Sequence, residues 1–244
     1  MQVEALAVQL RPRSMNEAVD LGVRLVQAHA RSVWASYAPV YAIVVLVALG
    51  SGAIASWLPT LIVFWLKPWL DRTLLFVLSR AVFGTPTRLA DVWAAQRQVW
   101  WQQLPSTLTW RRLSPWRAYT QPARQLEGQG GAAGRARRHQ LLRGKRGAAL
   151  AMHSAFAQLE GLLVIGVAAL WLWFAPGTDG TSLFDTLLRA ESPGTALLMS
   201  ALYAGVVLLV EPFYVGAGFA MYLNRRVELE AWDIEQEFRL AFAA

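Results

Sequence analysis

Residues 39–56 read PVYAIVVLVALGSGAIAS, and no side chain in this stretch carries a charge. A helix rises about 1.5 Å per residue, so the stretch is just long enough to cross a bilayer core of roughly 30 Å. The whole chain fits that environment, because 55% of its residues are hydrophobic and only 16% are charged. A soluble domain is about 25% charged. The stretch therefore predicts an integral membrane protein of the all-α class.

Other stretches are also long and apolar enough to cross the bilayer. They are residues 60–83, 148–174 and 195–223. With 39–56 they predict about four transmembrane helices in a single membrane domain, 1–244. Because Lys67, Pro68 and Asp71 interrupt the second of these helices, we expect it to be kinked, with the interruption facing protein or water.

The remaining segments are polar and flank the predicted transmembrane helices. Residues 14–37 begin with Ser14 and Glu17 at capping-box spacing and predict an amphipathic helix at the membrane interface. Residues 84–147 hold twelve basic and two acidic side chains with five tryptophans. We expect this belt to lie in the headgroup layer. Residues 225–242 predict a charged helix.

Basic residues set the orientation of membrane proteins, because they favour the cytoplasmic side. The belt carries twelve of them, whereas the turn near Trp57 and the loop 175–193 carry one between them. The belt should therefore be cytoplasmic, and with four crossings both termini lie in the cytoplasm as well.

Several strings resemble a group of uncharacterised bacterial inner-membrane proteins. They are WLKPWLDR at 65–72, LSRAVFG at 78–84 and TWRRLSPWR at 109–117. The end of the chain, with Glu211-Pro212-Phe213, YLNRR at 222–226 and EAWDIE at 230–235, is distantly similar to the membrane domain attached to some glycerophosphodiester phosphodiesterases. The chain shows no phosphodiesterase catalytic domain. The resemblance thus implies a membrane scaffold in the bacterial inner membrane, without that activity.

Ionisable residues at mid-membrane depth are the strongest functional signal. They are Lys67, Asp71, Arg72, Glu160 and Glu211. Each charge alone would cost at least about 2.5–3.5 kcal/mol at that depth. Lys67 and Asp71 have the i,i+4 spacing of an ion pair. The set predicts either a buried ionic network that fixes helix register or a polar binding site between helices.

Basic and aromatic side chains of the belt are candidates for contact with anionic phospholipids. They are Arg111, Arg112, Trp116, Arg117, Arg137 and Arg138. The chain has no cysteine, and its three histidines lack metal-ligand spacing, so we expect no metal and no cofactor. No catalytic motif is present, and the basic charge beside apolar helices indicates lipid rather than nucleic acid.

These features predict a non-enzymatic membrane scaffold, a subunit of a bacterial envelope assembly, with other membrane or envelope proteins or further copies of itself as partners. The alternative is a small oligomeric transporter or lipid-handling protein that uses the central charges. An intramembrane enzyme ranks third. The acidic residues of 225–242 form either a solvated face or a contact with the basic segment 135–146.

Overall fold

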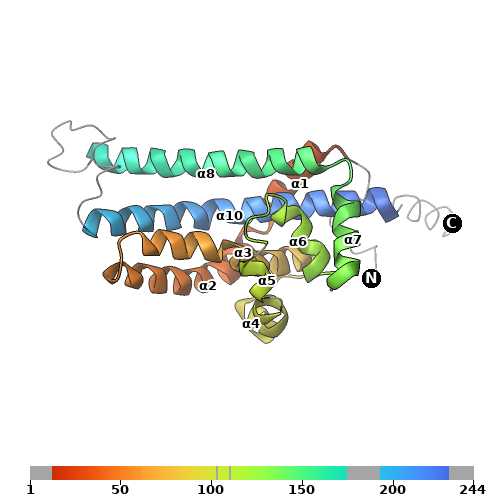
Figure 1. The fold of residues 1–244 in the computed structure, drawn as a ribbon, viewed down its shortest axis with the longest axis horizontal. Coiled ribbons are helices and arrows are strands. Elements are labelled where there is room, and N and C mark those ends of the chain that lie inside the picture. The colour runs from red at the N-terminus through yellow and green to blue at the C-terminus, as the bar shows by residue number, and fades with distance from the viewer. Residues whose placement is uncertain (1–12, 103, 110, 175–192, 231–244) are drawn as a thin grey trace.

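The computed structural model describes residues 13–102, 104–109, 111–174 and 193–230, and every regular element in those ranges is helical (Figure 1). The elements are α1 (Met15–Ala28), α2 (Ala30–Gly50), η2 (Ser51–Ala53), α3 (Leu58–Ala81), α4 (Leu89–Ala94), η3 (Arg97–Trp101), α5 (Leu104–Leu108), α6 (Arg117–Gln125), α7 (Gly131–Leu142), α8 (Arg146–Phe174) and α10 (Pro193–Glu230). The all-α class predicted from the sequence is confirmed for the described chain.

Four long helices, α2, α3, α8 and α10, run along the long axis of the molecule (Figure 1). The short helices α4 to α7 gather around one end of this bundle. Helix α10 is the central element, since it packs against α1, α2, α3, α6 and α8. Its buried side chains include Tyr214, Phe219 and Tyr222, which form part of the core.

Three of the described helices are long and apolar enough to cross a membrane: Ala30–Ala53, Arg146–Trp171 and Pro193–Glu230. Helix α3 is not among them, although it has 24 residues and continues through Pro68. Its charged side chains at Lys67, Asp71 and Arg72 are all buried in the protein. This burial agrees with an interruption that faces protein, whereas its position relative to lipid and a fourth crossing by 60–83 stay predictions.

The N-terminal segment differs from the expected single interfacial helix over 14–37. Ser14 and Glu17 do form the predicted capping box, but the helix ends near His29 and the next one begins at Ala30. Helix α1 packs on α10, and a Cβ at Gly22 would lie only 2.3 Å from the Gly216 carbonyl oxygen. Two glycines thus allow a backbone contact that places α1 against the bundle.

The belt over 84–147 also differs from the expectation of a layer spread on headgroups. Helix α6 lies against α10, where a Cβ at Gly218 would come within 2.6 Å of the Ala118 backbone. Tyr119 is fully buried. Within the belt, α4 and η3 are separate short helical elements. Small residues at 118 and 218 thus let α6 pack into the bundle, whereas contact of the rest of the belt with headgroups stays a prediction.

The charged end of α10 binds the basic segment, one of the two roles expected for 225–242. Glu228 contacts Lys145 at 2.9 Å, and Glu230 pairs with Arg137. Helix α10 continues to Glu230 without a break after the predicted transmembrane stretch 195–223. The rest of 225–242 and the predicted loop 175–193, apart from Pro193, lie outside the described residues.

Candidate functional site

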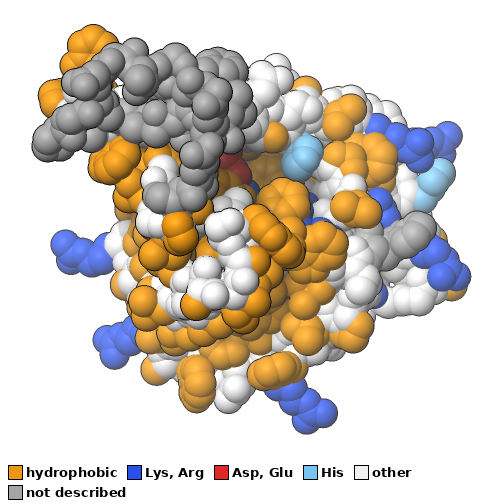
Figure 2. Space-filling model, turned by 60° about the vertical axis from the view of Figure 1, so that its left-hand side comes forward, with side chains coloured by type: hydrophobic (Ala, Val, Ile, Leu, Met, Phe, Trp, Pro, Cys, Tyr) orange, Lys and Arg blue, Asp and Glu red, His pale blue; other side chains and the backbone are white. Residues whose placement is uncertain are grey.

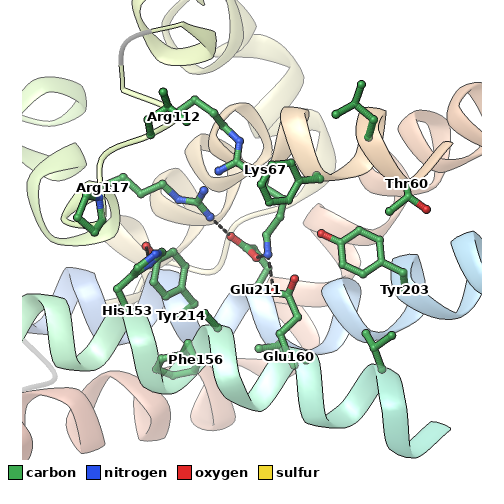
Figure 3. Close-up of a pocket in the computed structure, with 18 of the residues that line it drawn as sticks. Thr60, Lys67, Arg112, Arg117, His153, Phe156, Glu160, Tyr203, Glu211 and Tyr214 are labelled. Carbon is green, nitrogen blue, oxygen red and sulfur yellow. Dashed lines mark hydrogen bonds and ion pairs between the residues drawn. The ribbon is translucent and has the colours of Figure 1, made fainter. Parts of the chain in front are cut away.

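Glu211 is the centre of a buried ionic chain between α3, α6 and α10. Only 1% of this residue is exposed. Its Oε2 lies 2.7 Å from Lys67 Nζ, and its Oε1 accepts a hydrogen bond from Arg117 Nη2 at 2.8 Å (Figure 3). One carboxylate therefore joins a cation from α3 to a cation from α6.

Two further carboxylates extend the chain at its ends. Lys67 Nζ donates to Glu160 Oε2 of α8 at 2.5 Å. Arg117 Nε lies 3.3 Å from Asp71 Oδ2. The order is Glu160–Lys67–Glu211–Arg117–Asp71, with alternating charge. Such alternation is how a low-dielectric interior holds several charges, because each cation lies between two anions.

The structure brings together four of the five residues predicted for this cluster and replaces the fifth. Arg72 points elsewhere, and its Nε and Nη2 donate to the backbone carbonyls of Val99 and Gln98. Asp71 pairs with Arg117 and not with Lys67, the expected i,i+4 partner. Lys67 is already held by two other carboxylates. Tertiary packing thus overrides the spacing within one helix.

Arg117 was predicted to contact lipid headgroups, and the structure buries it instead. It is the first residue of α6, and its neighbour Ala118 packs on Gly218. Burial lowers the pKa of Arg117, but Asp71, Tyr214 and Glu211 outweigh that effect and raise it above its usual value. The guanidinium therefore stays charged in the interior. A sequence signal that could have indicated this contact is the small-residue string Gly216-Ala217-Gly218, which ends two turns after Glu211.

A cleft of about 1120 Å³ opens above the ionic chain, between α3, α8 and α10. Its walls are apolar and include Leu61, Phe64, Phe156, Val164 and Ile165. Lys67, Glu160 and Glu211 line it too, so charged groups lie among apolar walls (Figure 3). Figure 2 shows an acidic side chain in a recess among hydrophobic ones. The cleft thus combines a large apolar surface with a small charged one.

Arg112 is the least satisfied cation of the cleft. Its guanidinium carbon lies 3.8 Å from the centroid of the Phe64 ring, and the residue is 7% exposed. Its buried Nε and Nη2 have no hydrogen-bond partner among the described residues. Leaving such a donor unpaired costs about 1–3 kcal/mol, and more for a charged group. This cation therefore has hydrogen-bonding capacity available for an anion.

His153 and Tyr214 form a polar pair on the cleft wall. His153 Nδ1 and the Tyr214 hydroxyl are 3.0 Å apart. In the described parts of the chain, no group of three or more His, Asp or Glu side chains is placed to hold a metal ion.

The other predicted headgroup contacts have partners within the protein. Trp116 Nε1 donates to the Arg146 carbonyl oxygen at 3.3 Å, and Arg138 Nη2 donates to Ser114 Oγ at 3.1 Å. Arg137 binds Glu127 at 2.9 Å and also Glu230. Arg111 is half-buried beside a second cavity. The belt therefore folds on itself, and the side chains of Trp116, Arg137 and Arg138 bind groups of the protein.

No protein-family model, no curated protein and no solved structure matches this chain. The resemblance described above stays a prediction.

Proposed function

We propose that this protein binds an amphiphilic molecule with an acidic head group in the cleft between α3, α8 and α10. The proposal corresponds to the lipid-handling alternative expected from the sequence. It rests chiefly on Arg112, a buried cation with two nitrogens that no described residue pairs, in a cleft that is otherwise largely apolar.

The apolar walls favour a ligand with a hydrocarbon part. The cleft is somewhat larger than the roughly 300–1,000 Å³ of pockets that hold small molecules. Leu61, Phe64 and Ile165 are 40%, 44% and 57% exposed, so much of the wall is uncovered by protein. A fully polar ligand would leave this surface without apolar contact. An acyl or isoprenoid chain would cover it.

The charged groups favour an acidic head. Among the groups at the cleft, Lys67 and Arg117 are each held by two carboxylates, whereas Arg112 lies over the Phe64 ring and forms no ion pair with a described residue. An anion near Arg112 would accept hydrogen bonds from the N–H groups of this guanidinium and would leave the ionic chain intact. Charge-assisted bonds of this kind are about twice as strong as neutral ones. The ionic chain then positions the site, and Arg112 binds the ligand.

The position of α8 supports entry from the side of the bundle. Helix α8 packs mainly on α10 and leaves most of its side chains exposed, including Leu162 at 69%. If α8 crosses the bilayer, as its length and composition permit, the cleft beside it faces acyl chains. A membrane amphiphile could then enter with its head toward Arg112.

A pair of glycines on α8 offers a matched test. Gly161 lines the cleft and Gly166 does not, and a Cβ at either position meets nothing within 4 Å. We expect purified wild-type protein to retain an acidic amphiphile, detected by native mass spectrometry and solvent extraction. Gly161→Phe should lose it by filling the cleft, while Gly166→Phe should retain it.

Two results would reject the proposal: no amphiphile in the wild-type protein after gentle extraction, or equal retention by both variants. The non-enzymatic scaffold role expected from the sequence stays a separate prediction. The same preparation addresses it, since a scaffold would co-purify with protein partners whether or not the cleft is filled.

A further inference from the structure

Four arginines converge on a second, smaller cavity of about 30 Å³. Arg72 comes from α3, Arg124 from α6 and Arg138 from α7, while Arg111 precedes α6 in the chain. Ser114 and Arg117 line this cavity and also the large cleft, so the two sites are neighbours. We call the group of Arg72, Arg111, Arg124 and Arg138 the arginine pocket.

Among the described residues, no carboxylate lines the arginine pocket. Its other described lining residues are neutral, apart from Arg117, which is committed to Glu211 and Asp71. Burial, together with repulsion from Arg124, Arg138 and Arg72, lowers the pKa of Arg111 to about 10. Four cations thus repel one another at a partly buried position, and a bound anion would relieve that repulsion.

The pocket also has more hydrogen-bond donors than acceptors. Arg124 donates to Ser106 Oγ at 3.2 Å, and Arg138 donates to Ser114 Oγ. Each guanidinium carries five N–H donors. Arg72 directs its Nε and Nη2 to the carbonyls of Val99 and Gln98, so the donors left for a ligand lie chiefly on Arg111, Arg124 and Arg138. Gln121 and Gln125 line the same cavity, and Gln121 Nε2 and Gln125 Oε1 are buried without a hydrogen-bond partner among the described residues. The unpaired donors outnumber this one acceptor. An occupant must therefore accept several hydrogen bonds and carry negative charge.

We infer that the arginine pocket binds a phosphate group. A phosphate is tetrahedral, so its oxygens can accept from arginines that approach from several elements, whereas a carboxylate offers only two oxygens in one plane. The cavity has room for little more than the phosphate group itself, since one water needs roughly 10–15 Å³ by the same measure. Either a lipid phosphate or a soluble phosphate could supply this chemistry.

The site is separate from the proposed function, because it uses none of Lys67, Arg112, Glu160 or Glu211. It needs α6 to pack on α3 and α7 to pack on α6, which is the arrangement that the structure shows. Its occupancy would join three segments that otherwise bring like charges together. A bound phosphate is therefore expected to stabilise the folded protein.

The test is thermal unfolding of the full-length protein with two phosphate sources. The first is inorganic phosphate in detergent, titrated against chloride at constant ionic strength. The second is phosphatidic acid in phosphatidylcholine nanodiscs, compared with phosphatidylcholine alone. We expect the melting temperature to rise with at least one of them. A rise with inorganic phosphate indicates that soluble phosphate suffices, and a rise with phosphatidic acid alone indicates a lipid headgroup.

Charge-neutral variants test whether the arginines cause the effect. Arg111→Gln and Arg124→Gln should each weaken phosphate binding about 10–100-fold, the loss of one charge-assisted hydrogen bond. Arg135→Gln is the control, because Arg135 is exposed on α7 and lies outside the pocket. Gly161→Phe should keep the full phosphate effect, which separates this site from the cleft.

Ligand-free protein provides a second readout. Since the Arg111 guanidinium has no hydrogen-bond or ion-pair partner among the described residues and is repelled by its neighbours, Arg111→Gln should melt at the same temperature as wild type or higher. No stabilisation by either phosphate source would overturn the inference. So would an equal loss of binding in Arg135→Gln, or a lower ligand-free melting temperature for Arg111→Gln with unchanged phosphate affinity.

Discussion

Replacing Glu211 by glutamine should destabilise the protein more than replacing Asp71 by asparagine. Both changes are nearly isosteric and remove one buried charge, but the two carboxylates are held differently. Glu211 makes ionic contacts at 2.7 and 2.8 Å, whereas Asp71 makes one at 3.3 Å. Neither Asp71 oxygen has a hydrogen-bond partner among the described residues. The loss at Glu211 is therefore the larger.

The expected magnitudes follow from these distances. At an effective dielectric of about 20, unit charges 2.7 Å apart attract by roughly 6 kcal/mol before the cost of desolvation. Breaking a buried ion pair has a net cost of about 3–5 kcal/mol, which we assign to Glu211→Gln. For Asp71→Asn we expect about 1–3 kcal/mol, because a carboxylate without hydrogen bonds gains less from its partner.

Melting temperatures in one detergent, followed by tryptophan fluorescence, provide the measurement. The chain has twelve tryptophans. A loss of 1 kcal/mol corresponds to about 2–4 °C for a protein of this size. Asp20→Asn is the control, since Asp20 is exposed on α1. Two results would contradict this difference between the two carboxylates. One is an equal fall in melting temperature for Asp71→Asn and Glu211→Gln, and the other is a Glu211→Gln variant that behaves like the control.

Three further outcomes are expected. Gly22→Ala should lower the melting temperature, because its Cβ would lie 2.3 Å from a backbone carbonyl oxygen of α10, whereas Gly50→Ala meets nothing within 4 Å and should not. An equal effect of the two substitutions would contradict the close helix contact. Arg112→Met should keep or raise ligand-free stability and lower amphiphile retention at least about tenfold, measured by native mass spectrometry, since it removes a buried guanidinium with unpaired nitrogens. A destabilised variant with full retention would refute that role. Alkaline phosphatase fused after Gly180 should be active, and the same fusion after Gly130 inactive, because basic residues concentrate in 84–147. The reverse order would contradict the predicted topology.

The sequence predicted the members of the ionic chain better than their pairing. Lys67, Asp71, Glu160 and Glu211 stand out because charge is costly in apolar helices. Arg117 did not stand out, because it is one of twelve basic residues in the belt and lies 94 positions from Glu211. Only the contact of α6 with α10 distinguishes it from its neighbours.

The sequence could not predict the shape of the cleft or of the arginine pocket. Each is lined by residues from at least three separate elements, and no pattern within one helix encodes the distance between them. The belt illustrates the same difficulty. Its arginines and tryptophans indicated an interfacial layer, but Ala118 against Gly218 draws α6 into the bundle.

Local composition alone determined that the chain is helical, that it contains helices able to cross a membrane, and which charged residues need partners there. These are properties of short windows, since the apolar length, the helical rise and the cost of a buried charge do not depend on distant residues. Tertiary structure alone decided which cation pairs with which carboxylate and where a cleft stays open. It also decided which arginines lie together with no carboxylate among the described residues beside them. Those outcomes depend on close approach between helices far apart in the chain, at Gly22 with Gly216 and at Ala118 with Gly218.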